Sequence, residues 1–200
     1  LLLLVAAKAH INATDVDGNG PIHAAAANGH IDCLTTLIAV GADVDLANGD
    51  GETAALLAAQ GGHADLLDAL LRANITVTQP RLDGTTPIVA AAQRGHPAAL
   101  SVLLNAGTDV DALPVNDPAL LFPAAVYGYE CCAAILVRSK SDVDATRGQF
   151  TDGESAVLLA ARAGRLGVLQ VLLLAKADVN LGDRFGTTPT LAATIRNGDQ

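Results

Sequence analysis

The chain has 200 residues, with 12 Lys and Arg against 21 Asp and Glu, so its formal net charge is −9. Half of the residues are hydrophobic but only 2% are aromatic, so the apolar side chains are mainly Ala, Leu, Val and Ile. This composition favours closely packed helices over a β-sandwich or barrel. The acidic balance argues against nucleic acid or an anionic membrane as the partner, because both are bound by clustered Lys and Arg.

A step of 33 residues organises the chain. It separates three Gly-His pairs and a related Gly-Tyr pair: Gly29-His30, Gly62-His63, Gly95-His96 and Gly128-Tyr129. Three extra residues between Asp144 and Gly153 then shift the later copies of the pattern. One such unit is too small to bury its own apolar face, so the sequence predicts units that stack on one another.

Two helices are expected in each unit. The first is short and Ala-rich, follows a Thr or Ser and in places begins with Pro, whose missing N–H is harmless at that position. Thr86-Pro87 and Thr188-Pro189 show this pattern best. The second helix is rich in Leu. First helices are predicted near 21–28, 54–60, 87–94, 118–127, 155–163 and 189–196, and second helices near 31–40, 64–72, 97–105, 130–138 and 166–175.

The unit 114–149 departs most from the pattern. We expect Asp117 to cap its first helix and Pro118 to begin it, which would place Pro123 near the second turn, where proline distorts a helix. Lys140 replaces the glycine of the following turn. This unit is therefore either the least regular joint of the stack or a site shaped for a partner.

The recurring motifs resemble those of the ankyrin repeat family. A family unit reads approximately D-x-x-G-x-T-P-L-H-x-A-A-x-x-G-H, followed by an apolar helix and G-A-D-V-N. The segment 15–47 carries Pro21-Ile22-His23 and Gly41-Ala42-Asp43-Val44-Asp45 in that register, and Gly186-Thr187-Thr188-Pro189 opens the last copy. The resemblance covers the whole chain and implies an all-α ankyrin-repeat solenoid of stacked helix-turn-helix units joined by hairpin-like loops.

The same resemblance implies a single ankyrin repeat domain over residues 1–200. Its units are a partial copy at 1–14, full copies at 15–47, 48–80, 81–113, 114–149 with the three-residue insertion and 150–182, and a partial copy at 183–200. Residues 1–7 are apolar, but they fit the second helix of an earlier unit better than a signal peptide. No apolar stretch approaches the roughly 18 residues that a membrane-spanning helix needs.

Neither a metal nor a cofactor is expected. Asp15, Asp17 and Asn19 are spaced like the start of a calcium-binding EF-hand loop, but Ala26 stands where that loop needs a bidentate Glu. Equivalent histidines of stacked units lie about 8–10 Å apart, too far to share a zinc ion that holds each nitrogen at about 2 Å. We therefore expect the histidines of the Gly-His pairs to hydrogen-bond a neighbouring loop.

No enzymatic activity is expected either, because the chain has no HExxH, CxxC or P-loop motif. Cys33 and Cys132 occupy the same repeat position and are expected to be inert thiols in the core, whereas Cys131 is expected to be more exposed. Three cysteines without paired spacing favour reduced thiols and an intracellular, cytoplasmic compartment.

In ankyrin-type proteins the usual ligand is another protein, held by the turn tips and the concave face of the first helices. The resemblance places the following residues at this surface: Asp17, Asn19, Asn28, Asp50, Glu52, Gln60, Asp83, Thr85, Gln93, Arg94, Asn116, Tyr127, Asp152, Glu154, Arg162, Arg184 and Phe185. The tips are mostly acidic, which favours a basic protein segment, although acidic turns also keep an apolar stack in solution. Tyr127 and Phe185 are rare aromatic side chains of the kind that anchor interfaces.

The predicted function is a non-catalytic scaffold for protein–protein interaction. An alternative is a regulatory or substrate-recruiting segment of a larger multidomain enzyme, such as a kinase, acyltransferase or ubiquitin ligase, and a secreted effector is a third possibility. The resemblance also implies hydroxylation of Asn12 or Asn180 by a host enzyme, because both occupy the Asn position of the D-V-N turn.

Overall fold

The computed structural model describes residues 10–108, 120–146 and 152–197. Within these ranges the chain forms eleven helices and one isolated antiparallel bridge between Thr146 and Ser155. The first helices of the repeats are α2 (Pro21–Ala27), α4 (Ala54–Gly61), α6 (Pro87–Gln93), α8 (Leu121–Tyr127), α10 (Ala156–Ala163) and α12 (Pro189–Asn197). The second helices are α3 (Ile31–Ala39), α5 (Ala64–Arg72), α7 (Pro97–Asn105), α9 (Glu130–Arg138) and α11 (Leu166–Leu174). Except for α8, each helix agrees with its predicted range to within one residue at either end.

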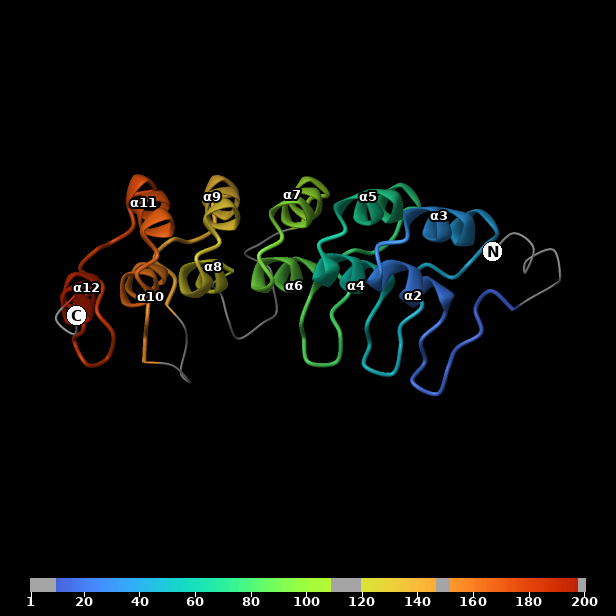
Figure 1. Cartoon of the computed structure of the whole chain (residues 1–200), viewed down its shortest axis with the longest axis horizontal. Helices are drawn as coiled ribbons and strands as arrows, with labels where there is room; N and C mark the ends of the chain where they lie inside the picture. The colour runs from blue at the N-terminus through green and yellow to red at the C-terminus, as the bar shows by residue number, and fades with distance from the viewer. Residues whose placement is uncertain (1–9, 109–119, 147–151, 198–200) are drawn as a thin grey trace. The chain divides into compact units, whose positions relative to one another are not determined.

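Contacts divide the chain into two compact units, Leu1–Thr108 and Asp109–Gln200. In the first unit, α2, α4 and α6 pack side by side in one layer, and α3, α5 and α7 form a second layer (Figure 1). In the second unit, α8, α10 and α12 form one layer and α9 packs against α11. The predicted stacking of helix pairs is thus confirmed within each unit, while the single domain over 1–200 and its repeat boundaries stay predictions.

The two layers are built from side chains of different size. Most inward positions of α4 are alanines, such as Ala55 and Ala58, that are fully buried and let neighbouring backbones approach closely. The second helices contribute the bulk: Leu66, Leu103 and Leu172 are all buried, as stacking of the repeats requires. Burying one leucine side chain contributes about 1.5–3 kcal/mol to folding, so these leucines hold successive repeats together.

The helix starts show where the predicted capping holds. The hydroxyl of Thr53 accepts a hydrogen bond from the N–H of Leu56 at 3.3 Å, and that of Thr188 accepts one from the N–H of Leu191 at 3.4 Å. As predicted, Pro87 begins α6 and is preceded by Thr86. The backbone of Thr86 is extended as an N-cap requires, but its side chain caps nothing, and the buried hydroxyl has no hydrogen-bond partner within the described ranges.

The helix of the irregular repeat starts later than predicted. It begins at Leu121 with Leu120 as its N-cap, so the expectation that Pro118 begins the helix is wrong; Asp117 and Pro118 lie outside the described residues. Pro123 is consequently the third helical residue, where the N–H has no partner inside a helix, and its ring causes no break in α8. Lys140 adopts the left-handed conformation of the glycine that it replaces, with φ 62°.

The cysteines differ in exposure. Cys132 is buried, as predicted, and burial raises the pKa of its thiol to about 11. Cys131 is exposed, also as predicted, but the expectation that Cys33 lies in the core is wrong, because its side chain is exposed. The equivalent Leu66 lies in α5, which packs against the preceding second helix α3. For Cys33, no second helix precedes α3 among the described residues.

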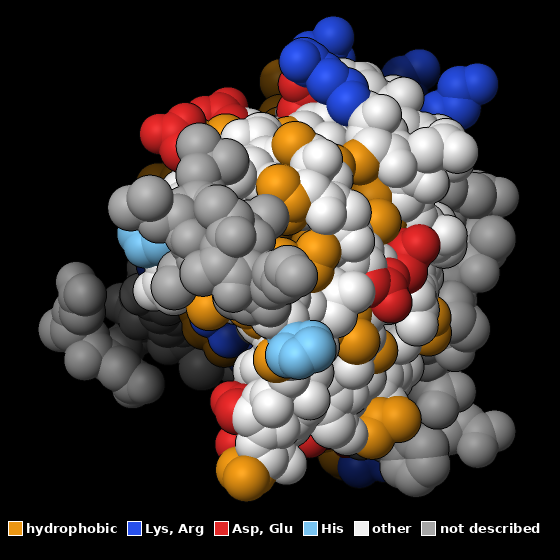
Figure 2. All heavy atoms as spheres, turned by 90° about the vertical axis from the view of Figure 1, so that its right-hand side faces the viewer, with side chains coloured by type: hydrophobic (Ala, Val, Ile, Leu, Met, Phe, Trp, Pro, Cys, Tyr) orange, Lys and Arg blue, Asp and Glu red, His pale blue; other side chains and the backbone are white. Residues whose placement is uncertain are grey.

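The surface carries both charged and apolar side chains. On the face drawn in Figure 2, hydrophobic side chains are interspersed with polar atoms, and acidic side chains form separate groups. Among the residues that the structure describes, no helix has the length and apolar character needed to cross a membrane.

Candidate functional site

Hairpins precede the first helices α2, α4, α6 and α12 and project away from the helical layers (Figure 1). In the first hairpin, the N–H of Asp15 donates to the carbonyl of Asn19 at 3.0 Å and that of Gly18 donates to the carbonyl of Asp15 at 3.1 Å. The same two bonds recur in the hairpins at 48–52 and 81–85. The three tips of the first unit therefore have one common backbone conformation.

Backbone hydrogen bonds also join each hairpin tip to the next. The N–H of Gly49 donates to the carbonyl of Asp17 at 2.8 Å, and the N–H of Leu82 donates to that of Asp50 at 3.0 Å. A side chain on Gly49 would lie 2.9 Å from the carbonyl oxygen of Asp17, so glycine permits this close approach. The tips are thereby held in a row with a fixed spacing.

A ladder of polar side chains runs beneath the same three tips. The amide of Asn48 donates to Asn19 at 2.9 Å and to Glu52 at 3.1 Å, and the guanidinium of Arg81 reaches Glu52 at 3.4 Å and Asp83 at 2.5 Å. The hydrogen bonds from Arg81 hold the pKa of the Asp83 carboxyl well below its usual range. Of the residues predicted to bind a partner, Asn19 and Glu52 are therefore already engaged with a neighbouring hairpin, and Asp83 is engaged with Arg81 of its own hairpin.

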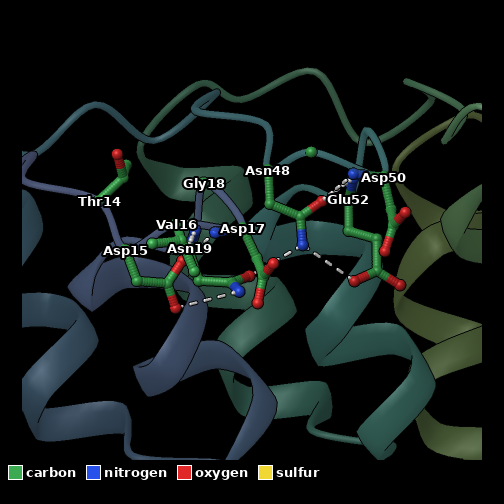
Figure 3. A pocket seen from close by; sticks show the side chains of 10 residues that line it. Thr14, Asp15, Val16, Asp17, Gly18, Asn19, Asn48, Asp50 and Glu52 are labelled. Atoms are coloured by element: carbon green, nitrogen blue, oxygen red, sulfur yellow. Dashed lines mark hydrogen bonds between the residues drawn. The ribbon is translucent and has the colours of Figure 1, made fainter.

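A shallow hollow opens between the first two tips (Figure 3). Asp15 lines it but turns its carboxylate to its own loop, where it accepts from the N–H of Asn19 at 2.8 Å and of Asp17 at 3.0 Å, and these bonds lower its pKa. Asp17 and Asp50 are exposed, and neither carboxylate has a partner within the described ranges. Val16, beside Asp17, is fully exposed. No group of His, Cys, Asp or Glu among the described residues is arranged to hold a metal ion.

In the second unit, an arginine of a first helix connects two hairpins. Arg162 of α10 pairs with Glu154 at the start of its own repeat and with Asp183 of the next repeat, the latter at 3.3 Å. Burial alone would raise the pKa of Asp183, which is only 7% exposed, but hydrogen bonds from the backbone N–H groups of Thr187 and Phe185 lower it overall. Glu154 and Arg162, both predicted to bind a partner, therefore stabilise the stack.

The last hairpin carries an exposed aromatic ring. The guanidinium of Arg184 pairs with Asp152 at 2.5 Å and lies 4.8 Å from the ring centre of Phe185. Phe185 itself is 69% exposed. Of these three predicted residues, Phe185 alone keeps its side chain available, because Asp152 and Arg184 hold each other.

The other predicted residues lie at the ends of the first helices or at a tip. Asn28 is exposed and donates to the carbonyl of Ala24 at 2.8 Å, while Gln93, Arg94 and Tyr127 are also exposed. Gln60 and Thr85 are half-buried. Asn116 lies outside the described residues.

The expected hydrogen bond to a neighbouring repeat is confirmed for two of the three histidines of the Gly-His pairs, while the ring of His30 forms none among the described residues. His96 hydrogen-bonds the carbonyl of Gln60 at 2.9 Å, and His63 hydrogen-bonds that of Ala27 at 3.3 Å. Each ring thus joins its own repeat to the preceding one. Sequence reasoning missed His23, which is buried and connects the N–H of Gly20 to the carbonyls of Leu46 and Glu52 in the next hairpin. The sequence feature that could have indicated this role is the histidine of the T-P-L-H motif, whose position His23 occupies.

The Asn position of the D-V-N turn also connects repeats. The side-chain oxygen of Asn12 accepts from the N–H of Asp43 at 2.9 Å, and Asp144, in the same register, accepts from the N–H of Asp178 at 2.7 Å. Asn12 and Asn180 are both exposed. Their hydroxylation stays a prediction.

The hairpins are joined tip to tip, the paired helices form two layers, and the turns are hydrogen-bonded to the preceding repeat. This arrangement defines a repeat protein of the ankyrin class. Family models agree: ankyrin repeats in three copies match residues 1–80, 22–114 and 56–147, and a single ankyrin repeat matches 152–184. The chain belongs to the ankyrin repeat family. Domains of this family generally bind proteins and are typically non-catalytic.

Solved structures share the fold at low sequence identity. The human ASB11 ankyrin repeat domain is 24% identical with a TM-score of 0.83, and the Bcl-3 ankyrin repeat domain is 23% identical with a TM-score of 0.77; each alignment covers 96% of this chain and 85% of that one. A chain of the complex between the Bd0816 predatory endopeptidase of Bdellovibrio bacteriovorus and the immunity protein Bd3460 is 22% identical with a TM-score of 0.76, over 94% of this chain and 95% of that one. Among curated proteins, no sequence matches this chain.

Proposed function

We propose that this chain is a non-catalytic scaffold that binds a basic segment of a partner protein at the hairpin tips of its first unit. The observation that carries the proposal is the pair of exposed carboxylates of Asp17 and Asp50, which lie on either side of Gly49 without an internal partner among the described residues. The neighbouring acids are held by other side chains, so these two remain for a ligand.

The hollow suits a lysine or arginine side chain. Hydrogen bonds to charged groups contribute about 1.5–3 kcal/mol each, and the tips are fixed by backbone bonds, so little conformational entropy is lost when a cation binds. Val16 provides an apolar surface beside Asp17 for the methylene stem of such a side chain. The exposed ends of α2 and α6, at Asn28 and Arg94, extend the binding surface along the first helices.

The remaining acidic side chains of the tips bind other groups of the chain and so stabilise the hairpins around this site. Neutralising Glu52 or Asp83 would release Arg81 from its ion pairs and disturb the ladder itself. A test of the binding surface therefore has to change Asp17 and Asp50, whose side chains support no other part of the structure.

The experiment measures binding of a fluorescein-labelled peptide of alternating Lys and Leu by anisotropy. The double variant Asp17→Asn/Asp50→Asn should bind about tenfold more weakly or worse, and association with the unmodified chain should slow as salt rises. The matched control is Asp32→Asn/Asp65→Asn, the same charge change on exposed acids of α3 and α5. Equal losses in both double variants would show that only net charge matters and would refute the proposal.

The same surface could recruit a substrate if the chain is a regulatory segment of a larger enzyme. The complete reading frame decides this alternative: a neighbouring catalytic domain supports it, whereas further repeats alone favour the scaffold.

A further inference from the structure

The turn between α10 and α11 carries an arginine where three earlier repeats have histidine. His63 and His96 each hydrogen-bond one carbonyl of the preceding repeat. Arg165 does the same through its Nε, which donates to the carbonyl of Val126 at 2.9 Å, and its stem packs on Gly128. One hydrogen bond from this position is therefore enough to join a repeat to the preceding one.

The guanidinium has more N–H donors than this one hydrogen bond uses. An arginine carries five N–H donors in a planar fork, and Arg165 uses only its Nε within the described part of the chain. The residue is exposed. Glu130, the first residue of α9, lies against Gly167 near the start of α11 and forms no ion pair with Arg165 in the described structure. The N–H groups on the two terminal nitrogens of this positively charged side chain are therefore available to a ligand.

Both tyrosines of the chain adjoin the glycine on which this arginine packs. Tyr127 and Tyr129 flank Gly128, on which the stem of Arg165 packs, and their ring centres are 5.7 Å apart. Tyr127 is 59% exposed, although Asn28, Gly61 and Arg94 occupy the same register in the first unit. The turns α8–α9 and α10–α11 are adjacent in Figure 1, and the stem of Arg165 packs on the glycine that separates the two tyrosines in sequence.

We infer that Tyr127, Tyr129 and Arg165 form a docking site for an acidic linear segment of a partner protein. A carboxylate of the segment pairs with the outer N–H groups of Arg165, because a guanidinium fork matches a carboxylate in geometry and charge. The exposed ring of Tyr127 receives the neighbouring apolar side chain of the segment. Tyrosine and arginine are also the residues most enriched at the centres of protein interfaces.

This site is separate from the acidic tips proposed above in both residues and charge. It lies in the second unit, at the turns between first and second helices, and it selects a negative rather than a positive segment. The two proposals can therefore fail independently.

The experiment selects a displayed library of random linear peptides on the full chain, with Arg165→His as the counter-selecting variant. Histidine keeps the turn hydrogen bond that His96 makes, so this variant removes the outer N–H groups while preserving the joint. Selected peptides should be enriched in Asp and Glu and should bind Arg165→His about tenfold more weakly. Tyr127→Asn, which introduces the residue type that follows α2 in the same register, should weaken binding of these peptides as well.

Two controls make the outcome decisive. Arg138→His makes the same change at an exposed position of α9 and should leave binding unchanged, and the thermal midpoint of Arg165→His should match that of the unmodified chain. Asp17→Asn/Asp50→Asn should also bind the selected peptides normally, which separates this test from that of the basic segment. Peptides that are neutral or basic, that bind Arg165→His equally well, or that cannot be recovered at all would overturn the inference.

Discussion

Substituting Gly62 by alanine should destabilise the first unit through a side chain of the next repeat. Gly62 ends α4 with φ 73°, and an added Cβ would lie 2.5 Å from Nδ1 of His96. The left-handed conformation costs an alanine about 1–2 kcal/mol. Displacing the ring also breaks the 2.9 Å bond from His96 to Gln60, which costs about 0.5–1.5 kcal/mol. The expected loss is therefore about 1.5–3.5 kcal/mol.

Gly41 provides the matched control for this substitution. It is also left-handed, with φ 87°, but an added Cβ would meet nothing within 4 Å. Lys140 and Lys176 hold the same register with positive φ, so Gly41→Ala should cost only the conformational part, about 1–2 kcal/mol. Urea unfolding followed by circular dichroism gives both values.

A double-mutant cycle with His96→Ala tests the mechanism directly. Once the ring is gone, Gly62→Ala should lose its steric part and cost about as much as Gly41→Ala, so the two changes should not be additive. If Gly62→Ala and Gly41→Ala cost the same in the unmodified chain, and the cycle shows no coupling, the reasoning about this contact is refuted.

Three further predictions concern buried polar groups. Thr86→Val should leave stability unchanged or raise it, because the lost hydroxyl is buried without a partner among the described residues. Thr53→Val should instead lower stability by about 1 kcal/mol, because it removes the cap of α4. Thermal unfolding compares the two variants. Because the pKa of Asp183 is lowered in the folded chain, the free energy of unfolding should decline as pH falls below 3.8, the ordinary pKa of this carboxyl. Urea unfolding over a pH series should show a smaller decline for Asp183→Asn. Two thiols should react quickly with a disulfide reagent near pH 8, while Cys132 should react only after denaturant is added, because it is buried with a pKa of about 11; thiol counts over time check this.

The sequence was sufficient for most helix positions because local signals mark them. Threonine or proline at the start and glycine at the end restrict the backbone whatever its surroundings. Only α8 was misplaced, and among the first helices it alone has neither Thr or Ser before it nor Pro at its first position in the described structure. Cys33 was misplaced for a different reason. Its repeat position is buried only where another second helix covers it, and such cover is not a local property.

The site was less predictable than the fold. Register correctly placed Asp17, Glu52 and Asp83 at hairpin tips, but it does not show which of them has an internal partner. Glu52 and Arg81 are 29 residues apart and meet only when hairpins stack. The opposite charges of such pairs, in adjacent repeats, were the sequence feature that could have indicated them. The arginine at 165 was visible as a departure from the Gly-His pattern, but its unused donors became evident only from the structure.

The bonds of His63, His96 and Arg165 to the preceding repeat have a consequence for engineering this chain. Each joint consists of a glycine from one copy and a long polar side chain from the following copy, so neither copy contains a complete joint. A module excised at the repeat boundary would separate the two halves, and its new neighbours would have to supply them again. Duplications and deletions should therefore be cut so that the glycine and the residue that packs on it are transferred together.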